Sequence, residues 1–155
     1  MSNPKYVFDT NIFINLKNRY PSDIFTSLWD QIETLFADGV VISSDEVIEE
    51  IKRGNDELEG WANARKNSFY PSNETIQLIV REILEQFSGL VTNSKKPNAA
   101  DPFLIALAKQ MTCSIVTEEN RSGDNSFPKI PNICEHYNIQ CIKFIDFLRE
   151  NNITS

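Results

Sequence analysis

The sequence predicts an α/β fold in which helices cover a central, mostly parallel β-sheet. Short apolar runs rich in strand-forming residues alternate along the 155 residues with segments of helical hydrophobic periodicity. Because parallel strands need crossover connections that are usually helices, this alternation is typical of a parallel sheet. The length suits one domain of ordinary size, and we expect residues 1–150 to form it and residues 151–155 to form a C-terminal tail.

The first strand is expected at residues 6–8, where Tyr-Val-Phe forms a short apolar run. A turn at residues 9–11 follows, and helical spacing of apolar residues begins directly after it. A second helix is expected to start near Ser22 or Asp23, either of which can cap it, and to end at Gly39.

The second strand is expected at residues 40–42, a Val-Val-Ile run. Ser43 or Ser44 can cap a third helix, which is expected to stop at Gly54. Residues 56–89 keep a helical pattern throughout, broken at a Pro-Ser-Asn sequence. They therefore predict two more helices.

A polar, exposed connection is expected at residues 91–98, which contain two lysines and a proline. Asp101 then predicts a helix start, with Asp101 as N-cap and Pro102 in the first helical position. The remaining expected elements are a strand at residues 113–117, a helix at 130–137, a strand at 140–142 and a closing helix at 144–149.

Five acidic residues are expected near one edge of the sheet, beyond the carboxyl ends of the strands, where open parallel sheets bind ligands. Asp9 follows the first strand, and Glu118 and Glu119 stand at the end of the third. Asp101 opens the helix that leads into that third strand. Glu50 lies in the helix after the second strand, close to its buried face. The topology would therefore bring these carboxylates together.

Each of these acids also has a purely structural interpretation. Asp9 and Asp101 can cap helices, and Glu50 can be a solvated acid in an acidic segment. A shared site is favoured because separate segments place carboxylates at one edge, where Arg121 is the nearest candidate cation. Clustered carboxylates repel one another unless they are protonated or bridged by cations, and hard oxygen ligands suit Mg²⁺ or Mn²⁺. The pattern indicates metal-assisted chemistry at phosphate oxygens.

Four motifs in order resemble those of PIN-domain nucleases. Residues 6–11 resemble the opening hydrophobic-D-x-N motif of that family, and residues 42–51 resemble its strand-S-x-x-V-x-x-E-L segment. Residues 101–108 are similar to its D-x-x-I-A-x-A helix, and residues 115–119 to its apolar-T-x-D ending. Each motif is weak alone, but the order, spacing and total length agree over nearly the whole chain.

The resemblance implies a three-layer α/β/α PIN-like fold and a Mg²⁺- or Mn²⁺-dependent ribonuclease. Small single-domain bacterial members of the family are mostly toxins of the VapC type, each neutralised by an antitoxin. By position, the resemblance implies Asp9, Glu50, Asp101 and Glu119 as an acidic quartet that binds metal, and Asn11 as a residue that orients Asp9 or a metal-bound water.

Two departures from the family pattern leave alternatives open. A glutamate stands where the last motif usually ends in aspartate, so either Glu118 or Glu119 can be the ligand. Glu49 precedes Glu50, and Glu50 is favoured because the apolar Ile51 matches the position after the family's acid.

The net charge of −7, from 15 Lys and Arg against 22 Asp and Glu, excludes a protein that holds nucleic acid through a broad positive surface. Residues 22–50 alone carry −8, and the rest of the chain, with 15 basic and 14 acidic residues, carries +1. An RNA substrate, single-stranded or structured such as tRNA, would therefore need a narrow basic rim. The candidates for that rim are Lys52, Arg53, Arg65, Lys66, Lys95, Lys96, Lys109 and Arg121.

Other enzyme classes fit poorly. The lone His136 lies far from the motifs, which argues against a Ser-His-acid hydrolase, and the sequence contains no glycine-rich phosphate loop. A haloacid-dehalogenase-type phosphatase needs a second Asp where Asn11 stands. The remaining alternative is a catalytically inactive PIN-like module that binds RNA or protein.

The three cysteines (Cys113, Cys134 and Cys141) form no C-x-x-C pair and are expected to serve as small apolar groups. The polar start and the absence of a long apolar run predict a cytoplasmic protein with no membrane partner. An antitoxin or a second copy of the chain, as in a homodimer, would dock on the apolar face of residues 73–87 or on the acidic helix at 22–38.

Overall fold

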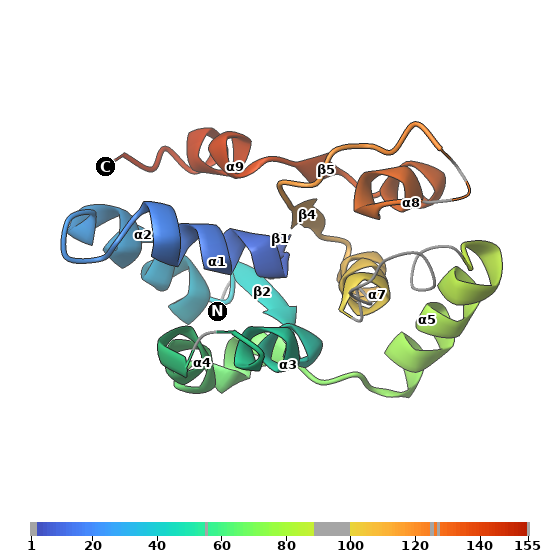
Figure 1. Ribbon diagram of the computed structural model, residues 1–155, viewed down its shortest axis with the longest axis horizontal. Coiled ribbons are helices and arrows are strands. Elements are labelled where there is room, and N and C mark those ends of the chain that lie inside the picture. Colours follow the sequence, from blue (N-terminus) through green and yellow to red (C-terminus); the bar gives the residue numbers. More distant parts are fainter. Residues whose placement is uncertain (1–2, 55, 89–99, 125, 127, 155) are drawn as a thin grey trace.

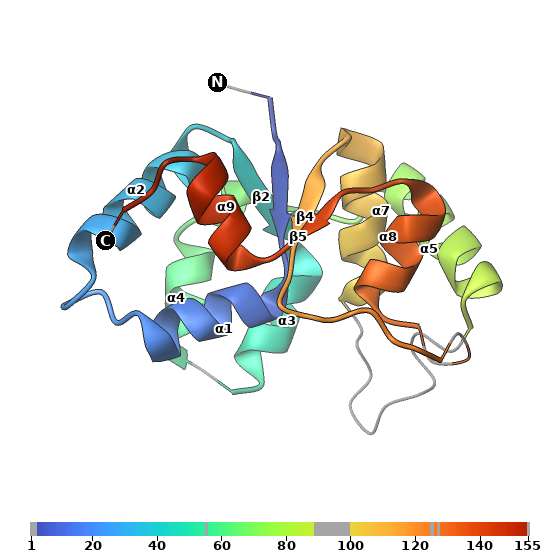
Figure 2. The same ribbon diagram turned by 90° about the horizontal axis from the view of Figure 1, so that it is seen from above.

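A computed structural model describes residues 3–54, 56–88, 100–124, 126 and 128–154, and it confirms the α/β fold class. All the strand pairs in the described chain are parallel, in the order β3-β2-β1-β4-β5. Helices α7 and α8 lie on one face of the sheet, and α1, α2 and α9 lie on the other (Figures 1 and 2). Helix α5 packs against α7. The expected connection at residues 91–98 lies outside the described residues.

The strands are β1 (Tyr6–Phe8), β2 (Val41–Ser44), β3 (Phe69–Tyr70), β4 (Ser114–Val116) and β5 (Cys141–Ile142). The helices are α1 (Thr10–Arg19), α2 (Thr26–Ala37), α3 (Asp45–Lys52), α4 (Asp56–Asn63), α5 (Glu74–Gln86), α7 (Asp101–Met111), α8 (Ile130–Tyr137) and α9 (Phe144–Glu150). No helix of the described residues has the length and apolar character needed to cross a bilayer.

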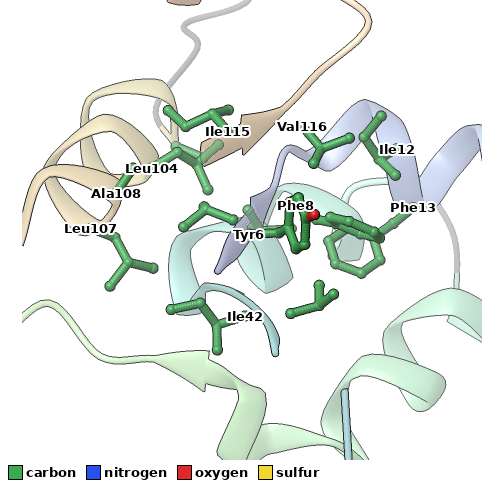
Figure 3. Close-up of a cluster of buried hydrophobic side chains, with 14 of the residues drawn as sticks. Tyr6, Phe8, Ile12, Phe13, Ile42, Leu104, Leu107, Ala108, Ile115 and Val116 are labelled. Carbon is green, nitrogen blue, oxygen red and sulfur yellow. The ribbon is translucent and has the colours of Figure 1, made fainter. Parts of the chain in front are cut away.

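Strand β1 is the centre of the core. Val7 and Phe8 are fully buried, and the Phe8 ring contacts the rings of Phe13 and Phe147 edge-on, at centroid distances of 5.7 and 4.9 Å. Figure 3 shows this apolar cluster on both sides of the strand. At the end of β1 the Ser43 hydroxyl donates to the Phe8 carbonyl at 2.7 Å. The sheet edge that follows β1 is therefore fixed by packing and by a buried hydrogen bond.

The start of α2 differs from the expectation. Residues 22–25 form a turn and α2 begins at Thr26, so neither Ser22 nor Asp23 caps it. The Pro21 carbonyl already accepts the N–H groups of residues 24 and 25, and the Thr26 hydroxyl donates to the Ser22 carbonyl at 2.9 Å. The backbone therefore closes this turn without a side-chain cap. At α3, in contrast, Ser44 is the cap, since its Oγ accepts the Glu46 N–H at 3.2 Å.

Strand β3 interrupts the stretch that was expected to hold only helices. Helix α4 ends at Asn63, a 3₁₀ turn spans Lys66–Ser68, and residues 69 and 70 pair with Ser43 and Ser44. A two-residue strand is too short for alternation to show in the sequence.

The tail after α9 packs back on the domain. The Ile153 N–H donates to the Leu148 carbonyl, and the Gln31 side chain of α2 donates to the Thr154 carbonyl at 2.7 Å.

Candidate metal centre

Three carboxylates meet at the carboxyl edge of the sheet. Strands β2, β1 and β4 are parallel neighbours, so the residues that follow β1 and β4 emerge side by side. One carboxylate oxygen each from Asp9, Asp101 and Glu119 lies within 4.8 Å of the other two. Asp9 and Asp101 are buried, and Glu119 is half-buried. We call these three residues the acidic triad.

Asp9 combines a capping role with its place in the triad. Its Oδ1 accepts the Thr10 N–H at 2.7 Å, and the residue is the N-cap of α1. Its Oδ2 accepts the Thr117 hydroxyl hydrogen bond, also at 2.7 Å. These two donors fix the orientation of the carboxylate.

Asp101 is not the N-cap that its sequence context suggests. Ala100 holds the cap position, and Asp101 is the first residue of α7 with Pro102 after it. Asp101 Oδ2 is buried and has no hydrogen-bond partner in the part of the chain that the structure describes. A buried, unpaired carboxylate oxygen is costly unless it is protonated or bound to a cation. This oxygen is therefore free for a metal ion.

The structure separates the two adjacent glutamates after β4. Glu119 joins the triad, and its Oε2 also accepts the Ile130 N–H at 3.2 Å at the start of α8. Glu118 is exposed, and its Oε1 accepts the Phe144 N–H at 3.4 Å at the start of α9. Glu118 therefore faces a different helix from the triad.

Glu50 lies beside the triad but outside its 4.8 Å spacing. Its Oε1 accepts the Thr10 hydroxyl hydrogen bond at 3.1 Å, and its charge acts on both Asp9 and Asp101. Glu49 is exposed and pairs with Lys52 at 3.1 Å. Of the two neighbouring glutamates, Glu50 is thus the one near the triad.

Asn11 and two threonines support Asp9. Asn11 Nδ2 lies 3.4 Å from Thr117 Oγ1, and Asn11 Oδ1 accepts the Glu118 N–H at 3.3 Å. Asn11 therefore reaches Asp9 through Thr117 rather than directly. Sequence reasoning gave Thr10 and Thr117 no role, although both stand inside the quoted motifs. The Thr117 hydroxyl donates to Asp9, whereas the Thr10 hydroxyl donates to Glu50 and its N–H to Asp9.

The triad carries strong electrostatic strain. Burial, and to a smaller extent the charges of the neighbouring acids, raises the pKa of Asp9 to about 7 and that of Asp101 to about 10. Burial also raises the pKa of Glu50, against the effect of the Thr10 hydrogen bond. Within the described chain, no ion pair involves the triad, and Arg121 pairs with Glu135 at 2.6 Å instead. This arrangement suits a divalent cation.

Several residues expected at a basic rim are engaged elsewhere. The Arg65 guanidinium lies 4.2 Å from the Trp61 ring centroid and pairs with Glu33 at 2.6 Å. The Lys109 amine lies 5.6 Å from the Tyr137 ring centroid. Arg53 remains close enough to Glu50 to lower its pKa. Lys95 and Lys96 lie outside the described residues.

Comparison with known proteins gives the fold likeness and the family of the chain. No curated protein sequence matches it significantly. The crystal structure of FitAcB from Neisseria gonorrhoeae is similar with a TM-score of 0.51 and 18% sequence identity, over 88% of this chain and 96% of that one. This likeness confirms the three-layer PIN-like fold. A family model described as "Domain of unknown function (DUF4411)" matches residues 6–155, and the chain therefore belongs to the DUF4411 family.

Proposed function

We propose that the chain is a divalent-metal-dependent endoribonuclease that hydrolyses phosphodiester bonds in RNA. The observation that carries the proposal is the buried Oδ2 of Asp101, which has no hydrogen-bond partner among the described residues and lies beside the carboxylates of Asp9 and Glu119. Oxygen donors of this kind fit Mg²⁺ or Mn²⁺. A bound ion would supply Lewis acidity at the phosphate and lower the pKa of a bound water.

The protein's own groups would hold and orient this centre. Asp9, Asp101 and Glu119 are the proposed ligands, and Glu50 is the proposed fourth acid at their side. The hydroxyl of Thr117 and the N–H of Thr10 keep Asp9 in one orientation by hydrogen bonds to its two oxygens. Such fixed carboxylates lose little freedom when they bind an ion.

The RNA is proposed to approach along a narrow basic rim. Arg53, at the end of α3, supplies positive charge close to Glu50, whereas the neighbouring Lys52 pairs with Glu49. A few phosphate contacts suffice to position a strand, because phosphate contacts fix orientation without broad attraction. Single-stranded RNA and tRNA are the substrates to test first.

Cleavage of a fluorescently labelled RNA with Mn²⁺, Mg²⁺ or EDTA tests the activity. We expect cleavage by the wild type with either ion and none with EDTA. Asp9→Asn should abolish cleavage and keep the fold, because asparagine preserves the shape of the side chain. Asp38→Asn, at an exposed acid after α2, is the matched control. A folded wild type that binds the RNA and does not cleave it with Mn²⁺ or with Mg²⁺ would instead be an inactive binding module.

We further propose that the chain is the toxin of a toxin–antitoxin pair, on the basis of the PIN-domain motifs. A groove of about 510 Å³ between α1, α2 and α4 offers a docking surface for the partner. Trp29 and Trp61 line it, together with the carboxylates of Asp23 and Asp30 and the ion pair of Lys17 with Glu57. An acidic groove with aromatic walls fits a basic, arginine-containing segment.

Induced expression in a bacterial host tests the toxin proposal. Growth should stop with the wild type, continue with Asp9→Asn, and recover when the neighbouring gene is co-expressed. Asp30→Asn should weaken the recovery and leave the toxicity in place, since Asp30 lines the groove and lies outside the triad. If the wild type cleaves RNA in vitro but its expression does not slow growth, the toxin proposal is contradicted and the ribonuclease proposal is not.

A further inference from the structure

Two cysteines from different elements touch one another. Cys134 lies in α8 and Cys141 in β5, and their sulfurs are in hydrogen-bond contact. The chain reverses between them at Asn138, which has a φ of 56°, and the Ile139 N–H returns to the Cys134 carbonyl at 2.9 Å. Both thiols are free. The contact is therefore set by a tight backbone turn.

The two thiols have different surroundings. Cys134 is 1% exposed, whereas Cys141 is partly open to solvent. The hydrogen bond from Cys134 lowers the pKa of Cys141, assisted by Lys143, and the same bond and burial raise the pKa of Cys134. Burial raises the pKa of the third thiol, Cys113, to about 11. Because the thiolate is the reactive form, Cys141 is the expected nucleophile.

We propose that Cys141 and Cys134 form a redox-active pair, in which a hydroperoxide oxidises Cys141 and Cys134 then closes an intramolecular disulfide. In the first step the Cys141 thiolate attacks one peroxide oxygen, the O–O bond breaks, and hydroxide or alkoxide leaves. In the second step the Cys134 sulfur bonds to the Cys141 sulfur, the S–O bond breaks, and the Cys134 proton leaves with that oxygen as water. Two electrons pass from the thiols to one peroxide.

The pair is joined to Glu119 from both sides. The N–H of Ile130, at the start of the helix that carries Cys134, holds Glu119 Oε2. The Lys143 amine, two residues after Cys141, donates to the Glu118 and Glu119 carbonyls at 2.8 and 2.7 Å. A disulfide brings the sulfurs to about 2.0 Å and draws α8 toward β5. Oxidation therefore weakens metal binding at Glu119, a consequence that rests on the proposed metal site.

Peptide mapping after treatment with hydrogen peroxide tests the pair itself. We expect a monomer that has lost two hydrogen atoms, with Cys134 linked to Cys141. Cys134→Ser should accumulate a sulfenic acid at Cys141 that dimedone traps, and the control Cys113→Ser should form the disulfide as the wild type does. The proposal would be overturned if Cys134 or Cys113 reacted first, or if disulfides formed only between chains. A sulfinic acid at Cys141 without a disulfide would also overturn it.

The rise in melting temperature caused by Mn²⁺ tests the consequence. The rise should be smaller in the oxidised protein, recover after reduction with dithiothreitol, and be insensitive to peroxide in a Cys134→Ser, Cys141→Ser double variant. An equal rise in oxidised and reduced wild type would refute the link to Glu119. If the reduced protein does not respond to Mn²⁺, the proposed metal site fails, and the mapping still decides the thiol pair.

Discussion

The substitution Asp101→Asn separates the electrostatic cost of the acidic triad from its packing. Asparagine keeps the shape of the side chain and removes its negative charge. In the metal-free fold the pKa of Asp101 is raised from 3.8 to about 10, so the folded chain keeps a proton that the unfolded chain releases. The stability from this group is fully present below about pH 4 and is lost as the pH rises toward 10. The free energy of unfolding should therefore fall with pH in the wild type.

The size of the fall in the free energy of unfolding follows from the single proton that Asp101 retains in the folded state. Each proton that folding retains changes the free energy of unfolding by about 1.4 kcal/mol per pH unit. Between pH 7 and 9 Asp9, with a pKa of about 7, is already losing its proton, and Asp101 remains the main protonated acid. The metal-free wild type should thus lose about 3 kcal/mol more than Asp101→Asn over these two units.

Urea denaturation in EDTA at pH 7, 8 and 9, followed by tryptophan fluorescence, measures this difference. Trp29 and Trp61 both contact the core and report its loss. Asp38→Asn should follow the wild-type curve, because Asp38 is exposed. Mn²⁺ should restore stability at pH 8 in the wild type and not in Asp101→Asn. Parallel pH curves for the wild type and Asp101→Asn in EDTA would refute the reasoning.

Three further tests address individual contacts. Glu119→Gln should abolish the Mn²⁺-induced rise in melting temperature, whereas Glu118→Gln should keep it. A thermal melt in which Glu118→Gln loses the rise and Glu119→Gln keeps it would make Glu118 the ligand. Thr117→Val should weaken Mn²⁺ binding measured by calorimetry by about 1–3 kcal/mol, because the ionised Asp9 loses a donor, and Thr117→Ser should recover it. Ser43→Ala removes only the hydrogen bond to the β1 backbone. It should therefore lower the free energy of unfolding, measured in urea, by about 1–2 kcal/mol and leave the Mn²⁺-induced rise in melting temperature unchanged. A lost rise would show that this bond also shapes the site.

The convergence of acids on one edge could be predicted from the sequence for a simple reason. Asp9 and Glu119 each follow a short apolar run, and neighbouring parallel strands end at the same edge whatever their side-chain details. The apolar side chains of β1 and β4 are buried and leave little freedom in register. The fold class and the position of the site thus depend on short apolar runs and on the acids that follow them, both of which are visible in the sequence.

The details of the site depend on offsets of one residue, which the sequence does not display. Consecutive residues in an extended segment point in opposite directions, so only the structure separates Glu118 from Glu119. Asp101 stands one position inside its helix, and this shift leaves its Oδ2 without a partner among the described groups. The thiol contact of Cys134 and Cys141 likewise depends on the reversal at Asn138 and not on a spacing motif.

Soaking crystals of the protein in Mn²⁺ and recording anomalous diffraction is the most direct test of the metal centre. We expect a strong anomalous peak within bonding distance of the carboxylates of Asp9, Asp101 and Glu119, and no such peak in crystals of Asp101→Asn. A fully occupied Mn²⁺ elsewhere, with the wild-type triad holding none, would contradict the proposal that these three acids form a metal centre.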